Sequence, residues 1–307
     1  MSNIWAEAVK LIKQEAVALG FDACGVADTE PFEEPATHLK TWLEKGMNGT
    51  MQYMATHLAE RISPRCLMPE AQSCIVVLMN YKPAQLQPSD APQVAKYAYG
   101  NDYHYIIRQK LVRLLDRINT TVAPCKGIAC CDTAPVLERA LAVRAGLGWI
   151  GKNGLLIHPV TGSYCLIGEL LIDLPLPPDT PKKERCGACR RCLDACPTGA
   201  LIAPYLLNVE KCIAYQTIEN HRDIPQDLLP KMGNCLFGCD SCLDACPWNR
   251  KVTEHTHREL DPLPELFSLE WNSLTRGQFN RIFRYSPLRR AGWQKIRTRL
   301  SGIVNNE

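Results

Sequence analysis

The chain has 307 residues, of which 46% are hydrophobic and 22% charged, and its formal net charge is +3. This composition suits one large domain or two ordinary ones with a packed core, and the small net charge neither requires nor excludes a nucleic-acid partner. No apolar run is long enough for a membrane helix and charges interrupt the N-terminal stretch, so we expect no signal peptide, no membrane partner and a cytoplasmic location.

Short apolar runs alternate with helical patterns along the first part of the chain. An amphipathic helix should open the chain and end near Gly20. Strands are predicted over residues 21–27, 74–81, 127–131, 154–157 and 164–172, and helices over 36–45, 102–119 and 135–145. The sequence therefore predicts an α+β protein whose residues 1–175 form a mixed α/β domain.

A proline-rich stretch marks the end of this domain. Four prolines fall between Leu174 and Pro181, which favours an extended connector. The next predicted domain, residues 176–255, holds eight of the sixteen cysteines in metal-ligand spacings. A ninth, Cys235, lies between them in the sequence. We interpret this grouping as cofactor binding in a reducing compartment rather than as a disulfide framework.

One cysteine run, Cys186-x2-Cys189-x2-Cys192-x3-Cys196-Pro197, has the spacing of bacterial ferredoxins, in which the cysteine before the proline crosses to the other cluster. A second run, Cys239-x2-Cys242-x3-Cys246-Pro247, repeats the ending of the first. Two interleaved runs favour iron–sulfur clusters over zinc, which usually binds separated cysteine pairs. Crossing leaves the second cluster one ligand short, and Cys235 and Cys212 compete for that place, because spacing alone does not decide. The first 4Fe-4S cluster would be held by Cys186, Cys189, Cys192 and Cys246, and the second by Cys196, Cys239, Cys242 and one of the two competitors.

The upstream domain has its own candidate residues. Asp132 follows an apolar run before a helical pattern, where it could be a helix N-cap or a catalytic group. Asp102, His104 and Tyr105 form a second polar group at a helix start. Residues 146–151 satisfy a dinucleotide-binding pattern, but they follow a helix instead of a strand, so we expect a loop whose backbone can approach a large ligand.

These segments together resemble the epoxyqueuosine reductase family. The resemblance rests on residues 97–104, 132–139 and 146–153, on both cysteine runs and on the sequence Cys246-Pro-Trp-Asn249, and it extends to about residue 292. It implies an enzyme that uses cobalamin and two 4Fe-4S clusters to reduce epoxyqueuosine to queuosine at the wobble position of tRNA, the last step of queuosine biosynthesis. An external donor would supply the electrons, and we expect a monomer.

The resemblance also assigns roles to residues. Asp132 is expected to be the proton donor, with Asp102, His104 and Tyr105 near the substrate. The family pattern gives Cys212 as the fourth ligand of the second cluster, which leaves Cys235 as an extra thiol beside it. Cobalamin is expected to contact Arg61, Asp132 and the loop residues Gly151, Lys152, Asn153, Gly154, Leu155 and Leu156.

Two chemical expectations follow. Desolvation in a closed pocket should raise the pKa of Asp132, so that the carboxyl holds its proton at neutral pH. The sequence around His104 lacks the glycine of the DxHxxG pattern, so we expect no histidine of the protein to ligate cobalt. Two other functions remain alternatives, a cobalamin-dependent reductive dehalogenase and a two-cluster electron carrier.

The C-terminal segment, residues 256–307, is expected to be basic and helical. Between Arg276 and Arg299 lie eight basic residues and no acidic one. Phe279, Phe283, Tyr285 and Trp293 are interleaved with them, a composition typical of a nucleic-acid face, although a solvated basic helix has it too. Many members of the family continue into a helical-repeat region, whereas this sequence ends at Glu307, which bears on how much of the tRNA contact surface it contains and not on the core chemistry.

Overall fold

The computed structural model describes residues 2–304. Its centre is an antiparallel sheet in the order β1-β2-β7-β4, where the strands are β1 (Ala23–Asp28), β2 (Ser73–Asn80), β7 (Cys165–Ile172) and β4 (Gly127–Cys130). All eight residues of β2 are buried, as expected for an apolar strand covered on both faces. Each predicted strand has a counterpart, with shifts of one or two residues at some ends.

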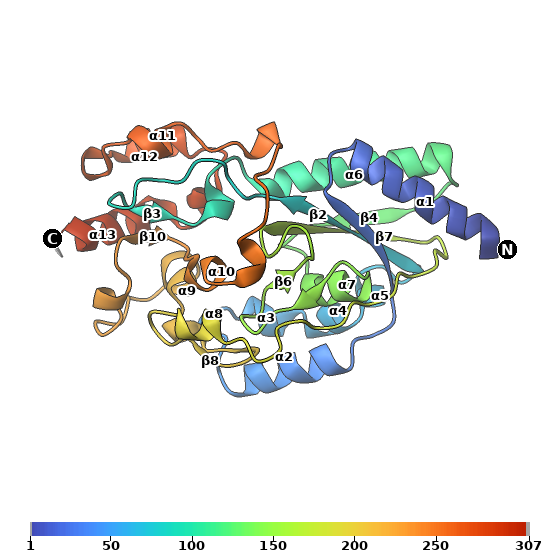
Figure 1. Cartoon of the computed structure of the whole chain (residues 1–307), viewed down its shortest axis with the longest axis horizontal. Helices are drawn as coiled ribbons and strands as arrows, with labels where there is room; N and C mark the ends of the chain where they lie inside the picture. Colours follow the sequence, from blue (N-terminus) through green and yellow to red (C-terminus); the bar gives the residue numbers. More distant parts are fainter. Residues whose placement is uncertain (1, 305–307) are drawn as a thin grey trace.

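Helices cover both faces of this sheet (Figure 1). Helices α1 (Ser2–Ala18) and α6 (Tyr103–Thr121) pack on one face, where Ile12 and Leu111 meet the side chains of Val77 and Leu170. Gly168 of β7 allows α6 to approach closely, because a Cβ there would lie 2.4 Å from Ile107.

The opposite face is covered by α7 (Glu138–Arg144) together with a run of helices that begins with α2 (Glu34–Glu44). The predicted helices at 36–45, 102–119 and 135–145 are thus confirmed with shifted ends, and Gly146 ends α7 with a φ of 69°. On this side of the sheet, three short helices were not predicted: α3 (Tyr53–Thr56), α4 (Leu58–Ile62) and α5 (Pro64–Leu67).

The cysteine-rich segment is made of loops and short elements. They are α8 (Arg191–Asp194), β8 (Leu201–Ala203), β9 (Leu206–Leu207), α9 (Ile213–Ile218), β10 (Cys235–Phe237) and α10 (Ser241–Asp244). Strand β10 pairs in parallel with β3 (Gln93–Val94) of the upstream part. A short hairpin of β5 (Trp149–Ile150) and β6 (Leu156–Ile157) carries the loop between residues 150 and 156.

The C-terminal segment forms α11 (Glu265–Ser268), α12 (Arg276–Ile282) and α13 (Gly292–Val304), at the end of the molecule opposite to α1 (Figure 1). Its core is shared with both other parts, since Val94, Phe237 and Phe283 belong to one buried cluster. The boundaries between residues 1–175, 176–255 and 256–307 therefore stay a prediction. The three parts do not each have a core of their own, because this cluster contains residues from all three. Within residues 2–304, no helix has the length and apolar character that crossing a membrane requires.

Candidate functional site: an acid–base chain and two cysteine groups

Asp132 lies just after β4, in the tight loop that leads to α7. Its φ of 54° is unusual for a residue other than glycine, and its backbone N–H donates a hydrogen bond to Glu138 Oε1. The interpretation of Asp132 as a helix N-cap is wrong, because the residue at that place is Leu137. The loop instead presents the Asp132 side chain, which is 43% exposed, toward the start of α6.

A hydrogen-bonded chain joins Asp132 to the start of α6. His104 Nε2 lies 2.6 Å from Asp132 Oδ2, and His104 Nδ1 lies 2.5 Å from Asp102 Oδ1. Asp102 also caps α6, since Asp102 Oδ1 accepts a hydrogen bond from the His104 backbone N–H at 3.1 Å. The structure thus brings together three of the four residues predicted to be catalytic.

The pKa of Asp132 shifts in the direction opposite to the one predicted from the sequence. Burial alone would raise the pKa of Asp132, but the hydrogen bond and the charge of His104 outweigh burial, so the pKa of Asp132 is lowered. Burial likewise opposes the charged form of His104, yet the hydrogen bonds to Asp102 and Asp132 raise the pKa of His104 to about 9. At neutral pH the imidazole of His104 therefore holds the proton, and its Nε2 lies 2.6 Å from Oδ2 of the Asp132 carboxylate.

The two tyrosines beside His104 have different environments. Tyr105, the fourth residue predicted to be catalytic, is 67% exposed on the surface of α6, and its role stays a prediction. Tyr103, which the sequence did not single out, stacks on His104 with ring centroids 4.1 Å apart and donates a hydrogen bond that helps to lower the pKa of Asp132.

Two further carboxyl groups lie close to Asp132. Glu138 sits at the start of α7, and Glu169 lies in the middle of β7 and is fully buried. Sequence reasoning assigned no role to either. A signal existed for Glu169, because it is the one charged residue in the sequence CLIGELLI, which was predicted to be a strand from its apolar run.

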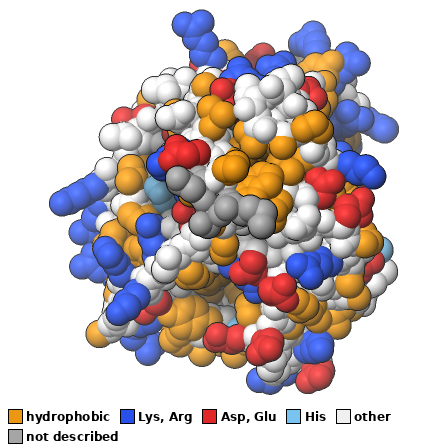
Figure 2. All heavy atoms as spheres, turned by 90° about the vertical axis from the view of Figure 1, so that its right-hand side faces the viewer, with side chains coloured by type: hydrophobic (Ala, Val, Ile, Leu, Met, Phe, Trp, Pro, Cys, Tyr) orange, Lys and Arg blue, Asp and Glu red, His pale blue; other side chains and the backbone are white. Residues whose placement is uncertain are grey.

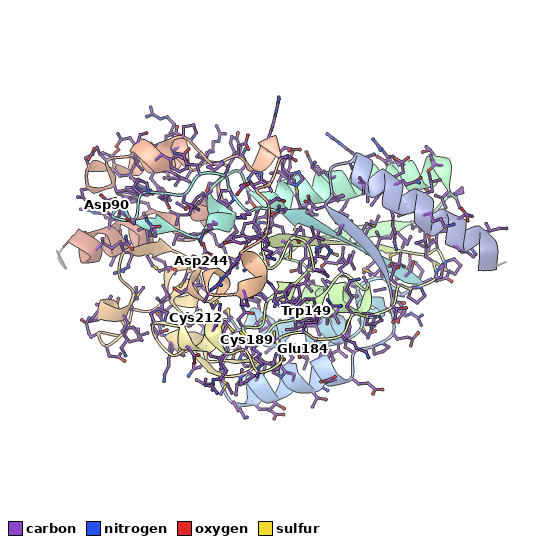
Figure 3. The ribbon with its side chains drawn as sticks, in the orientation of Figure 1. Asp90, Trp149, Glu184, Cys189, Cys212 and Asp244 are labelled. Atoms are coloured by element: carbon purple, nitrogen blue, oxygen red, sulfur yellow. The ribbon has the colours of Figure 1, made fainter. Side chains whose placement is uncertain are left out.

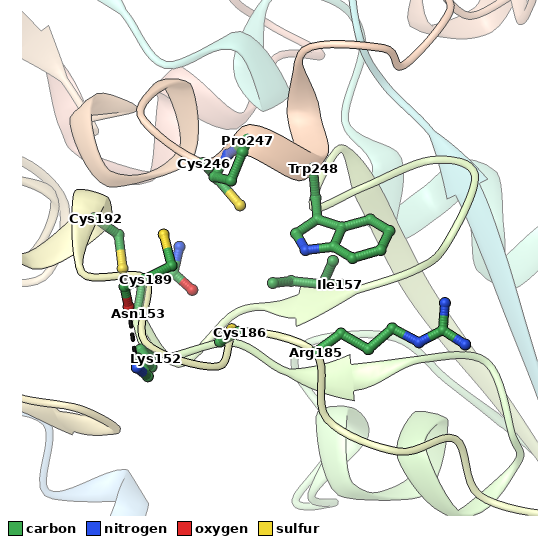
Figure 4. A pocket seen from close by; sticks show the side chains of 10 residues that line it. All are labelled: Lys152, Asn153, Ile157, Arg185, Cys186, Cys189, Cys192, Cys246, Pro247 and Trp248. Carbon is green, nitrogen blue, oxygen red and sulfur yellow. Dashed lines mark hydrogen bonds between the residues drawn. The ribbon is translucent and has the colours of Figure 1, made fainter.

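The first group of cysteines surrounds a pocket (Figure 4). The thiols of the four residues predicted to hold the first cluster line this pocket, together with Ile157 and Trp248. The Cys186 thiol accepts a hydrogen bond from the backbone N–H of Lys152. Trp149 packs against this group, and its buried indole N–H is directed at the Cys186 thiol, where it opposes the rise in the pKa of Cys186 that burial causes. A tryptophan N–H in this place can donate to a cysteine sulfur that holds a cluster.

The second group of cysteines contains Cys212 and lies beside the first, with Cys189 between Cys212 and Trp149 in the view of Figure 3. Burial raises the pKa of Cys212, and the thiols of Cys239 and Cys196 add to that rise. Cys242 has the same electrostatic neighbours and also interacts with Cys212, so these four thiols lie close together. Cys235, on β10, hydrogen-bonds Cys239 and thereby lowers the pKa of Cys239 to about 6.

The glycine-rich loop between β5 and β6 reaches the cysteine-rich segment with its side chains. Lys152 Nζ donates to the carbonyl oxygens of Gly187 and, at 3.0 Å, of Cys189, and Asn153 is buried with its amide 3.4 Å from Cys242 O. These side chains therefore face the cysteine groups, so any contact of this loop with a large ligand would come from its backbone. On its other side, Gly154 O accepts a hydrogen bond at 2.8 Å from Arg139 of α7.

Arg61, predicted to bind cobalamin, lies on α4. Its guanidinium donates to Tyr53 O at 3.3 Å and interacts with the charge of Glu138. Arg61 Nε is buried and has no hydrogen-bond partner within residues 2–304. An unpaired buried donor is costly unless a ligand supplies an acceptor.

The C-terminal basic segment differs in part from the predicted nucleic-acid face. Phe279 and Phe283 are buried core residues. Arg299 is also buried and donates to Cys235 O at 2.8 Å, and Lys295 donates to Ile218 O at 2.9 Å, so these two side chains tie α13 to the cysteine-rich segment. The prediction that these four residues face a nucleic acid is therefore wrong, because their side chains are used inside the fold.

Other side chains of this segment are exposed next to the acid–base chain. Tyr285 is 66% exposed with the Arg284 guanidinium 5.2 Å from its ring centre, and Tyr285 O accepts a hydrogen bond from Asp102 N–H at 2.6 Å. Arg284 and Arg289 are exposed as well. At the opposite end of the molecule, around α1, basic and acidic side chains are interspersed (Figure 2).

Two groups of cysteines with cluster-ligand spacing and a separate acid–base chain in one fold fit an iron–sulfur oxidoreductase. Residues 185–249 match a 4Fe-4S double cluster binding domain, and residues 61–133 match the family described as epoxyqueuosine reductase QueG, DUF1730. An epoxyqueuosine reductase from Cellulophaga algicola is 42% identical over 299 residues, which covers 96% of this chain and 95% of that protein. The chain belongs to the epoxyqueuosine reductase family and is a reductase.

Solved structures of the family have the same fold. An epoxyqueuosine reductase crystallised with a tRNA-Tyr epoxyqueuosine-modified stem loop matches with a TM-score of 0.88 at 28% identity, covering 98% of this chain and 81% of that one. The enzyme from Bacillus subtilis, with an aspartate-bearing catalytic loop swung out of the active site, matches with a TM-score of 0.87 at 28% identity, covering 98% and 82%.

Proposed function

We propose that this enzyme reduces the epoxide of epoxyqueuosine in tRNA to the alkene of queuosine, with electrons passed through two 4Fe-4S clusters and Asp132 as the proton donor. The reaction takes up two electrons and two protons and releases the epoxide oxygen as water. The proposal includes an external electron donor, and it includes a cytoplasmic location because the substrate is a tRNA. Relatives of the protein are named for the same reaction.

The observation that carries the proposal is the chain from Asp102 through His104 to Asp132. The raised pKa of His104 keeps a proton on the imidazole at neutral pH, and the lowered pKa of Asp132 makes its carboxylate the acceptor in the resting enzyme. When negative charge develops on the epoxide oxygen, the proton can move from His104 Nε2 to Asp132 Oδ2 and from the Asp132 carboxyl to that oxygen. Asp102 holds the imidazole in place through Nδ1.

The cysteine groups fit the two clusters. Thiolates are the ligands that iron–sulfur clusters prefer, and donors surround these sulfurs: Cys186 accepts from Lys152 N–H, and Cys196 Sγ accepts from Ala200 N–H at 3.3 Å. We assign one cluster to Cys186, Cys189, Cys192 and Cys246 and the other to Cys196, Cys212, Cys239 and Cys242.

The residues present also fit cobalamin. Arg61 offers a buried donor without a partner, which suits an amide or phosphate oxygen of the cofactor, and the loop backbone from Gly151 to Leu156 lies between Arg139 and the first cysteine group. His104 uses both ring nitrogens within the acid–base chain, so it is not available as a cobalt ligand. When bound, cobalamin supplies the strongly reducing cobalt centre that an unactivated epoxide requires.

The tRNA would approach over the C-terminal segment. Arg284, Tyr285 and Arg289 are exposed, and the backbone hydrogen bond between Asp102 and Tyr285 sets this surface next to the acid–base chain. Arginines suit phosphate contacts, and an exposed tyrosine suits stacking of an unpaired base.

The experiment is anaerobic incubation of the reconstituted enzyme with an epoxyqueuosine-modified stem loop, with and without added cobalamin, followed by mass spectrometry of the nucleosides. We expect queuosine only when cobalamin is present. Reduction of a halogenated aromatic compound in place of the stem loop would favour the dehalogenase alternative. Filled clusters without turnover of either substrate would favour the electron carrier.

A further inference from the structure

Glu169 is a carboxyl group buried without a partner. It lies on β7 between Val76 of β2 and Cys130 of β4, on the face of the sheet that α7 covers. It is 0% exposed, and neither carboxyl oxygen has a hydrogen-bond partner among the described residues. An ionised carboxylate in such a place carries a large desolvation penalty, and burial together with the charges of Glu138 and Asp132 raises the pKa of Glu169 well above its usual value. Glu169 is therefore protonated at neutral pH.

Glu138 connects this buried group with the acid–base chain. Its Oε1 accepts the backbone N–H of Asp132, so the carboxyl group of Glu138 lies next to the Asp132 loop. Burial and the negative charge of Asp132 raise the pKa of Glu138 to about 7. Near neutral pH, Glu138 can therefore both hold a proton and release it.

The groups that face this pair do not neutralise it. Burial raises the pKa values of the neighbouring thiols, which keeps those thiols uncharged. Positive charge reaches Glu138 from arginines and from the imidazole, whereas the charges that act on Glu169 are the negative ones of Glu138 and Asp132. The titratable and charged groups around the pair are Arg61 on α4, Cys74 on β2, Tyr103 and His104 on α6, Cys130 and Cys131 at β4, Asp132, and Arg139 on α7.

The reaction needs one more proton than the acid–base chain holds. Reduction of an epoxide to an alkene breaks both C–O bonds, adds two electrons and releases the oxygen as water with two protons. The clusters supply the electrons, and the hydrogen bond between His104 and Asp132 holds one proton. The second proton must reach the same oxygen, and Glu138 is the protonatable group attached to the Asp132 loop.

We propose that Glu138 stores the second proton of each turnover next to the Asp132 loop and delivers it to the Asp132 carboxylate, while the buried Glu169 behind it stays neutral. In this step an O–H bond of Glu138 breaks and one forms on Asp132, which passes the proton to the departing oxygen. Glu138 then regains its proton from solvent, and Glu169 keeps its own. The inference rests on the proposed function, because it assumes that Asp132 protonates the leaving oxygen.

Infrared spectroscopy tests the store without turnover. At neutral pH the Glu138→Gln variant, in which residue 138 has no acid proton, should have a C=O stretching band of a neutral, buried carboxylic acid that shifts only slowly in deuterated water. The double variant Glu138→Gln/Glu169→Gln should lose this band. Leu171→Val is the matched control, because it removes a buried methylene two residues along the same face of β7 and leaves both carboxyl groups intact.

Single-turnover kinetics tests delivery. We expect the wild-type rate to fall as the pH rises through about 7, the pKa of Glu138. Glu138→Gln keeps an oxygen that can accept the Asp132 N–H but carries no transferable proton, so it should lower the rate by about 10²-fold at pH 7 and abolish this pH dependence. Glu169→Gln should lower the rate by a smaller factor, because Glu138 can still exchange with solvent, and Leu171→Val should keep the wild-type pH profile.

The outcomes separate this inference from the proposed function. If Asp132→Asn is inactive while Glu138→Gln has the wild-type rate and pH profile, the proton store is refuted and the proposed function stands. If the acid band persists in Glu138→Gln/Glu169→Gln, the assignment of a neutral carboxyl group to Glu169 is wrong whatever the kinetics. If the wild type does not convert epoxyqueuosine, the proposed function fails, and the infrared result still decides whether Glu169 holds a proton.

Discussion

The cysteine-rich segment and the Asp132 region position their functional groups in different ways. In residues 185–249, short loops gather thiols, and backbone N–H groups such as that of Ala200 point at the sulfurs. Around Asp132, side chains from separate elements pair directly, and His104 and Asp132 are 28 residues apart. The contrast teaches that the electron path can be organised by local chain geometry, whereas the proton path depends on how α6 packs against the sheet.

One hairpin links the two regions. Lys152 binds the carbonyl oxygens of the first cysteine loop, and Gly154 two residues later accepts a hydrogen bond from Arg139 of α7. If electrons and protons are supplied separately, then a variant in one region should leave the function of the other intact. The following predictions test that separation.

The largest effect is expected from Cys212→Ser. Loss of a ligand should remove the second cluster and abolish turnover, because the electron path is interrupted. Iron content should fall to about half of the wild-type value, while binding of the tRNA stem loop is retained. Iron quantification, electron paramagnetic resonance and a binding assay check this.

Cys235→Ser is the matched control, since Cys235 hydrogen-bonds Cys239 but is not one of the assigned ligands. We expect full iron content and normal turnover. The opposite result, loss of the cluster in Cys235→Ser and retention in Cys212→Ser, would show that Cys235 is the fourth ligand.

Asp132→Asn should lower the single-turnover rate by about 10²- to 10⁴-fold, the usual contribution of a general acid. Both clusters should still form and accept electrons, which anaerobic reduction followed by spectroscopy can measure. Wild-type turnover of this variant would remove Asp132 from the mechanism, and loss of iron would contradict the separation of the two regions.

Arg284→Ala and Arg289→Ala should each weaken binding of the tRNA stem loop and reduce the salt dependence of binding by roughly one unit of slope, since each would remove one phosphate contact. Lys10→Ala, on α1 at the other end of the molecule and paired with Glu7, is the control and should bind as the wild type does. Equal effects of all three variants would mean that binding follows net charge and not this surface.

The smallest effect concerns stability and pH. The pKa of His104 is raised from 6.5 to about 9 in the folded protein, so its stabilising effect is complete below pH 6.5 and is lost as the pH rises through about 9. His104→Gln should flatten the pH dependence of the unfolding free energy in that window. Denaturant unfolding between pH 6 and 10 measures this, and parallel curves for the two proteins would contradict the assignment of the proton to His104.

The sequence was most informative where function depends on short spacings. The cysteine runs predicted both groups, although the place of Cys212 came only from resemblance, because it lies 27 residues before Cys239 and no local spacing links them. Strand and helix positions were predicted from apolar periodicity, yet α3 to α5 were missed because each has only one turn.

The proton path was the part that the sequence could not give in full. It pointed to Asp132 and His104 separately but not to their hydrogen bond, and it therefore gave the wrong direction for the pKa of Asp132. The basic segment was misjudged for a similar reason, since Phe283 and Arg299 belong to a core formed with residues far away in the chain.

The most direct test is to measure iron, sulfide and cobalt in anaerobically reconstituted wild-type protein and to follow the conversion of an epoxyqueuosine-modified stem loop in the same preparation. We predict about eight irons and one cobalt per chain, with conversion to queuosine. A preparation with full iron that binds no cobalt and leaves the stem loop unchanged would contradict the proposed reaction and reduce the protein to an electron carrier.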